Sequence, residues 1–142
     1  MNTDQLLNEQ SRSLRLIETS MCCLNAAIKN IGLGSGDESI QSLVTADSIT
    51  PNVDLYTAIK ITALTSALTI NNHTGTASEM YAFIIRIKDD GDGPYDITWD
   101  TEYRAIGVTL PITIDHNKTM YIGMIWNAYD STFDVTSVMI EV

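Results

Sequence analysis

The sequence predicts a mainly β protein in which an N-terminal α-helical coiled coil precedes an antiparallel, jelly-roll-like β-sandwich, assembled as a homotrimer. The first observation is that apolar residues recur every seven positions over residues 1–31, as in helices that supercoil around one another. The second is a change to period two from about residue 39, with turn signals between the apolar runs. We therefore expect a coiled-coil stalk at 1–31, a Gly-containing linker with a first irregular or β segment at 32–55, and the sandwich at 56–142.

The predicted helix spans residues 3–31, and its apolar stripe defines the oligomerisation seam. The seam residues are Leu7, Gln10, Leu14, Ile17, Met21, Leu24, Ile28 and Ile31. Leu at position a with Ile at position d favours three or four strands over two. We expect a parallel trimer with a stalk of about 42 Å, at about 1.5 Å per residue. A tetramer is the alternative, and a helix folded back on the β-domain would show a wider stripe.

Gly32 ends the heptad pattern and suits the residue that follows a helix. The stretch 32–38 contains three glycines in a G-x-G-x-G pattern. A phosphate-binding loop of that kind must follow a strand and begin a helix, whereas this stretch follows a helix. We interpret it as a linker.

The β part of the sequence has one strong alternating segment, in which Tyr81, Phe83, Ile85 and Ile87 share a face. Residues 89–94 are predicted to form a hairpin loop that leads into a returning strand at 95–99. Residues 120–127 are apolar at both odd and even positions, which predicts a central strand buried on both faces. The apolar phase then slips near residues 136–137, which predicts a β-bulge in the last strand. Shorter strands are expected at 59–63, 68–70 and 103–108, with Pro111 limiting the next strand to an edge or a strand start.

The charge and the two cysteines narrow the possible functions. The net charge is −10, and the excess of acidic residues lies after residue 31. Such a surface repels phosphate backbones and anionic lipids, so we expect neither nucleic acid nor membrane as a partner. No apolar run is long enough for a transmembrane helix, and the N-terminus does not resemble a secretory signal. The adjacent Cys22 and Cys23 are expected to be reduced thiols outside the seam.

The sequence offers weak candidates for a metal-binding or catalytic site. The acidic stretch 89–92 is the best metal candidate, but it is too tight for a calcium loop and lacks the trailing glutamate. His73 and His116 lie in predicted turns, without metal-ligand spacing around them. No nucleophile elbow accompanies them. We expect no metal, no cofactor and no enzymatic activity.

Six aromatic residues in the C-terminal half allow two interpretations. They form either part of the sandwich core or a patch on which a carbohydrate stacks, and the core is the default because sandwiches use aromatic residues at this frequency. These residues are Trp99, Tyr103, Tyr121, Trp126, Tyr129 and Phe133.

Three segments carry a resemblance to a known group of proteins. They are 84–91 (IIRIKDDG), 97–111 with RAIGVTLP at its end, and 120–135 with MYIGMIWN at its start. Together they resemble the C-terminal β-domain of small structural proteins of tailed-bacteriophage virions, both head-fibre or decoration proteins and tail fibres. The resemblance covers about residues 75–142. It implies a β-sandwich used as a virion building block, on the capsid or on the tail, and it brings no catalytic motif.

These observations predict a structural bacteriophage virion protein, made in the host cytoplasm and located in the virion. In this interpretation a coiled-coil trimer carries β-sandwich heads that decorate the capsid, and its partners are its own copies and other virion proteins of capsid or tail. The alternative is a tail-fibre tip or adaptor that binds a host surface glycan. A polysaccharide-degrading spike is disfavoured, because it needs paired carboxylates on a far longer β-helix.

Overall fold

The computed structural model describes residues 2–5, 8–12 and 39–142 of the chain. Residues 3–5 and 8–12 are helical, and residues 39–142 lie in one compact unit, called the β-unit below. No helix in these described ranges is long and apolar enough to cross a membrane. Most of the predicted coiled coil lies outside them.

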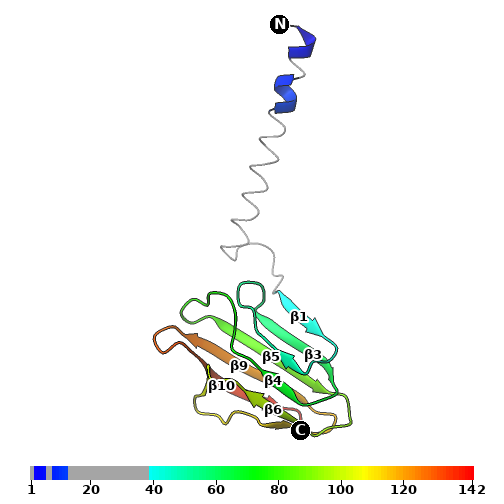
Figure 1. Cartoon of the computed structure of the whole chain (residues 1–142), viewed down its shortest axis with the longest axis vertical. Helices are drawn as coiled ribbons and strands as arrows, with labels where there is room; N and C mark the ends of the chain where they lie inside the picture. The colour runs from blue at the N-terminus through cyan, green and yellow to red at the C-terminus, as the bar shows by residue number, and fades with distance from the viewer. Residues whose placement is uncertain (1, 6–7, 13–38) are drawn as a thin grey trace. The chain divides into compact units, whose positions relative to one another are not determined.

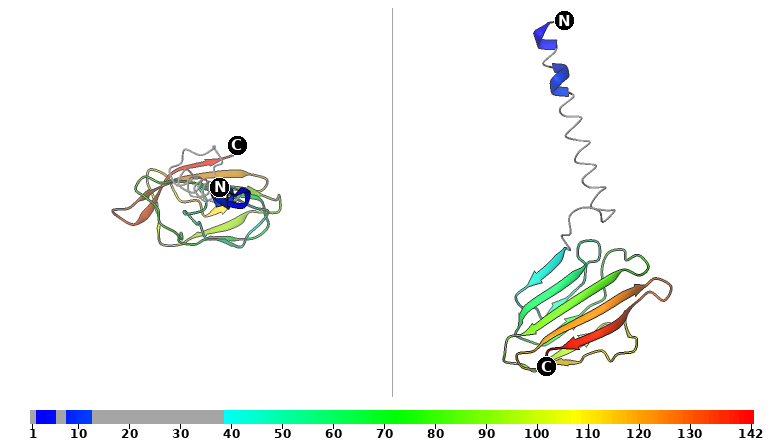
Figure 2. Two further views of the ribbon diagram at one scale, coloured as in Figure 1. Left: turned by 90° about the horizontal axis from the view of Figure 1, so that it is seen from above. Right: turned by 180° about the vertical axis from the view of Figure 1, so that it is seen from behind.

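The β-unit consists of two sheets that pack face to face, seen as two layers in the view from above in Figure 2. The larger sheet has six strands in the order β1-β3-β5-β9-β10-β7, and the smaller has four in the order β2-β4-β6-β8 (Figure 1). The strands are β1 Ile40–Leu43, β2 Ser48–Ile49, β3 Ala58–Leu64, β4 Leu68–Ile70, β5 Ala82–Asp89, β6 Tyr95–Trp99, β7 Tyr103–Ala105, β8 Thr113–Ile114, β9 Thr119–Asn127 and β10 Thr132–Ile140.

The first six strands wind back and forth between the sheets. β1, β3 and β5 lie side by side in the large sheet and run parallel, and β2, β4 and β6 do the same in the small one. Among the strands in the described part of the chain, antiparallel pairs occur only where β9 joins β5 and β10 and where β8 joins β6. The prediction of a β-sandwich is confirmed, but the antiparallel, jelly-roll-like arrangement is wrong because the sheets are mixed.

The loop at residues 90–94 shows how the winding works. It was expected to close a hairpin, yet β5 pairs with β3 and β9, whereas β6 pairs with β4 and β8. The loop therefore crosses from one sheet to the other, and strand β6 has the expected bounds but a different partner. A short polar loop with glycines suits both connections, since either one only has to reverse the chain.

The C-terminal hairpin of β9 and β10 is confirmed, and so is its bulge. The register between these strands shifts between Val135 and Ser137, at the predicted phase slip. β9 is central, lying between β5 and β10, but it is not buried on both faces. Tyr121 is 41% exposed and Ile125 is half-buried, because the second layer covers only the opposite face of this strand.

The core lies between the two sheets. The predicted face of β5 is confirmed: Phe83, Ile85 and Ile87 are fully buried. Other strands of both sheets contribute further fully buried apolar side chains to the core, among them Ile59, Ile61, Leu64, Leu68, Ile70, Ile114, Met120, Ile122 and Phe133. β8 follows Pro111 and ends the small sheet at one edge, as expected from the proline.

The N-terminal limit of the β-unit differs from the expected limit at residue 56. β1 pairs with β3, and β2 pairs with β4, so both strands complete sheets formed by later residues. Val53 is also buried in the core. The segment 39–55 therefore belongs to the β-unit.

Candidate functional site: an assembly surface

The predicted seam falls almost entirely outside the described residues. Of its members the structure describes Gln10, which lies in the helical stretch 8–12 with an exposed side chain. The other seven are Leu7, Leu14, Ile17, Met21, Leu24, Ile28 and Ile31. The seam therefore stays a prediction from the heptad pattern.

The β-unit has an apolar free edge at the C-terminal half of β10. β7 pairs with β10 only at residues 133–135. Beyond the bulge, in the part of the chain that the structure describes, residues 136–142 pair with no strand on the side away from β9. Met139 is 62% exposed, Ile140 is 50% exposed, and Val142 is fully exposed. An edge with these residues and without proline or lysine is open to pairing with another chain.

The opposite edge of the same sheet is β1. This strand pairs with β3, and within the described ranges it has no partner on its other side. Ile40 is 47% exposed, and Val44, just after the strand, is 71% exposed. The six-stranded sheet therefore offers apolar side chains at both of its edges.

The two edges lie at the same level along the strands. The register runs from Leu43 through Ile61 and Ile87 to Met120 and then Ile140. In the neighbouring row of paired residues, Ser42 is likewise level with Met139. The four residues of β1 therefore share their rows with residues 137–140, in the part of β10 that has no described strand on the side away from β9.

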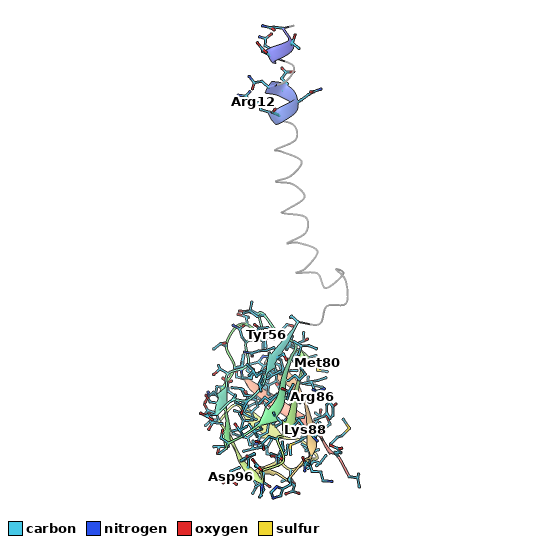
Figure 3. The ribbon with its side chains drawn as sticks, turned by 90° about the vertical axis from the view of Figure 1, so that its right-hand side faces the viewer. Arg12, Tyr56, Met80, Arg86, Lys88 and Asp96 are labelled. Atoms are coloured by element: carbon cyan, nitrogen blue, oxygen red, sulfur yellow. The ribbon has the colours of Figure 1, made fainter. Side chains whose placement is uncertain are left out.

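The outer face of the large sheet is partly apolar and partly basic. Ile84 is 50% exposed on β5, and Arg86, two residues on, is in register with Lys60 on β3 and Tyr121 on β9. Arg86 and Lys88 lie on the same side of the β-unit in Figure 3. The Arg86 Nε atom is buried without a hydrogen-bond acceptor. This face thus differs from the acidic character of the chain as a whole.

His73 lies among core rings. Its side chain is 9% exposed, and its Nδ1 atom is 2.8 Å from Glu102 Oε2. The ring packs edge-on against Trp126 and Phe133, at centroid distances of 4.5 and 5.2 Å. The same Glu102 oxygen accepts the His73 backbone N–H at 3.1 Å. The pair joins the loop after β4 to the start of β7, which is a structural role.

The acidic stretch 89–92 is organised by one buried carboxylate. Asp89 is 1% exposed and accepts the backbone N–H groups of Gly91, Gly93 and Asn117 at 2.8, 3.2 and 2.6 Å. Its oxygens are thus directed at protein donors. His116 is exposed, and its Nδ1 atom lies 3.2 Å from the Gly91 carbonyl. Across the described ranges, no three His, Cys, Asp or Glu side chains are grouped so that they could hold a metal ion.

The aromatic residues separate into core and surface. Tyr103, Trp126 and Phe133 are buried, and Trp99 packs against the core. Tyr121 and Tyr129 are exposed, the latter to 96%. Since they lie on different elements, a strand face and the β9–β10 turn, the six residues do not form one stacking patch.

Comparison with known proteins found no match. The chain matches no protein-family model and no curated protein sequence.

The free edges are the feature that the sequence did not reveal. The phase slip located the bulge, but nothing local showed that β7 would pair with only three residues of β10. Partners so distant in sequence depend on the whole topology.

Proposed function

We propose that this protein is a structural component of a bacteriophage virion, in which a coiled-coil trimer carries β-sandwich heads on the capsid as a head fibre or decoration protein. The observation that carries the assembly role is the apolar edge at residues 138–142, because large exposed apolar surfaces on a folded domain are typically covered by a partner. The heptads of residues 7–31 supply the means of bringing copies together.

The trimer is tested by light scattering of the full chain. The expected mass is three times the 15.6 kDa of one chain. Leu14→Asp with Ile28→Asp places charges in the seam and should give monomers. Thr19→Asp with Ala26→Asp, at the outward f position of the same heptads, is the matched control and should stay trimeric. A trimer that survives the seam variant contradicts the seam.

The location is tested on purified particles from an infected culture. Mass spectrometry should detect this chain in particles, and a cryo-EM map should show projections of trimeric symmetry on the capsid. Particles that lack the chain would overturn the virion assignment. Density at the tail instead of the capsid would favour the second candidate function.

The second candidate is a tail-fibre tip or adaptor that binds host glycan. The observation in its favour is Tyr129, which is 96% exposed on the β9–β10 turn, since sugars stack on exposed aromatic rings. Binding to a glycan array that Tyr129→Ala abolishes would support this function. Tyr121→Ala is the control variant and should keep glycan binding, because Tyr121 lies on the outer face of the large sheet and not on this turn.

A further inference from the structure

We infer that in the assembled protein strand β1 of one copy pairs in parallel with the free half of β10, residues 136–142, of the next copy. This inference rests on the proposed trimer, since the coiled coil is what brings the copies together. It gives each open edge of the large sheet a partner, namely the other open edge in a neighbouring copy. The partner is a second copy of this chain.

Symmetry favours this pairing over a self-pairing of either edge. An edge that meets its own copy makes a two-fold dimer, whereas unlike surfaces that meet head to tail can close a ring. Three copies around an axis need such an unlike pair. The large sheet provides one, with β1 at one end and, beyond the three residues covered by β7, β10 near the other.

Strand direction agrees with the same arrangement. β1, β3 and β5 run in one direction, β9 runs opposite to β5, and β10 runs opposite to β9. β1 and β10 therefore point the same way. Copies held by a parallel coiled coil have the same orientation along the axis, so β1 of one copy meets β10 of the next as a parallel pair.

The level and length of the edges also match. The four residues 40–43 share their rows with residues 137–140. An in-register pair of β1 of one copy with the free part of β10 of the next therefore needs no shift along the strands.

Backbone groups suitable for the pairing face outward at β10. The Glu141 N–H donates to the Thr119 carbonyl of β9 at 2.9 Å. Since successive residues of a strand direct their backbone groups to alternate sides, Val138 and Ile140 direct theirs to the free edge. On one face of the joined sheet, exposed Ile40 of one copy would then lie near exposed Met139 of the other. On the opposite face, Leu43 would lie beside exposed Ile140.

Engineered cysteines in the full chain test this contact. In a background of Cys22→Ser and Cys23→Ser, Ser42→Cys is combined in turn with Ser137→Cys, Met139→Cys and Glu141→Cys, which lie at two-residue steps along β10. Neighbouring strands are about 4.8 Å apart, within the Cα separation that a disulfide spans. One of the three pairs should give covalent trimers on oxidation, and a reducing agent should return them to single chains.

Two controls separate edge pairing from mere proximity. Thr62→Cys, on β3 and exposed, replaces Ser42→Cys and should give no covalent trimer. In the pair that forms a cross-link, Ile140→Pro removes a free-edge donor and should lower the cross-linked fraction at least tenfold, whereas Ile140→Val should not. Circular dichroism checks that both variants keep the β fold.

The outcomes distinguish this inference from the proposed function. A chain that is trimeric by light scattering but forms no cross-link in any of the three pairs overturns the edge pairing and leaves the trimer intact. A monomeric chain overturns both. Covalent ladders longer than three overturn the closed ring, and covalent trimers that Ile140→Pro leaves unchanged overturn backbone pairing at this edge.

Discussion

The ring of His73 packs edge-on against Phe133, with the ring centroids 5.2 Å apart. Phe133 is fully buried, and the rings of Phe83, Tyr103 and Trp126 also surround it at 5.0 to 6.4 Å. This cluster joins β10 to β5, β7 and β9. It is the aromatic centre of the core.

Phe133→Ala should therefore destabilise the β-unit by about 3–5 kcal/mol, since it removes a buried ring and leaves a cavity that neighbours fill only in part. Urea unfolding of the full chain, followed by tryptophan fluorescence, measures the loss. Tyr129→Ala is the control, and its effect should be within about 0.5 kcal/mol. Equal losses in the two variants would contradict the assignment of the core.

Asp89→Ala should destabilise the chain by about 3 kcal/mol, because three backbone donors lose a buried carboxylate acceptor. The loop at 90–94 and the turn containing Asn117 share this acceptor, so both should become more open to hydrogen exchange. Exposed Asp92→Ala is the matched control and should change the unfolding free energy by less than about 0.5 kcal/mol. If the backbone amides of both segments exchanged as slowly in Asp89→Ala as in the wild type, this role of Asp89 would be contradicted.

The ion pair of Arg104 and Asp134 predicts an acid-dependent part of stability. Their atoms Nε and Oδ1 lie 2.8 Å apart, and hydrogen bonds from Arg104 lower the pKa of the Asp134 carboxyl below its ordinary value. A lowered folded-state pKa gives stability that is present above the unfolded-state pKa and is lost as pH falls through the folded-state value. Because the Arg104 side chain is 42% exposed, the effect should be modest.

In urea unfolding, Asp134→Asn should therefore be less stable than the wild type at pH 7, with the difference shrinking between about pH 5 and pH 2. The control is Asp96→Asn, an exposed carboxylate at the start of β6, which should follow the wild-type profile. A constant difference for Asp134→Asn across this range would exclude the ion pair as the cause.

The buried phenol of Tyr103 predicts a part of the stability that is lost at alkaline pH. Its hydroxyl donates to the Asn71 carbonyl at 2.7 Å, and burial raises the pKa of the phenol above its ordinary value. A raised folded-state pKa gives stability that is complete below the unfolded-state pKa and is lost as pH rises above it.

Tyr103→Phe should cost about 1 kcal/mol at neutral pH, from the lost hydrogen bond. It should also weaken the fall in stability above about pH 10, the ordinary tyrosine pKa. Tyr129→Phe, at an exposed position, is the control and should leave the alkaline profile unchanged. Identical alkaline profiles for both variants would contradict a buried Tyr103 phenol.

Local pattern predicted which residues face the core, but not which strands become neighbours. Alternation identified the buried face of β5 at Phe83, Ile85 and Ile87, because side chains on a strand alternate whatever its partner. The phase slip similarly located the bulge at residues 136–137. Neither the alternation nor the phase slip predicts which strand lies next to it in the sheet.

The errors have the same physical origin. The loop at 90–94 reverses the chain whether it leads to the same sheet or to the other one, so its glycines and aspartates did not decide between them. Parallel sheets usually read as continuous apolar runs because both faces are covered. Here the large sheet is covered on one face, so its parallel strands alternate as antiparallel strands do. Tyr121 and Ile125 on β9 were misread for the converse reason, since they are apolar residues on the open face.

The position of β9 between β5 and β10 has a consequence for the nascent chain. During synthesis, β1 to β6 leave the ribosome well before residues 119–127, yet β5 needs β9 to complete its backbone pairing. The growing chain therefore exposes one side of β5 until residues 119–127 have been synthesised. The large sheet can be completed only after β9 and β10 have emerged, rather than progressively from the N-terminus.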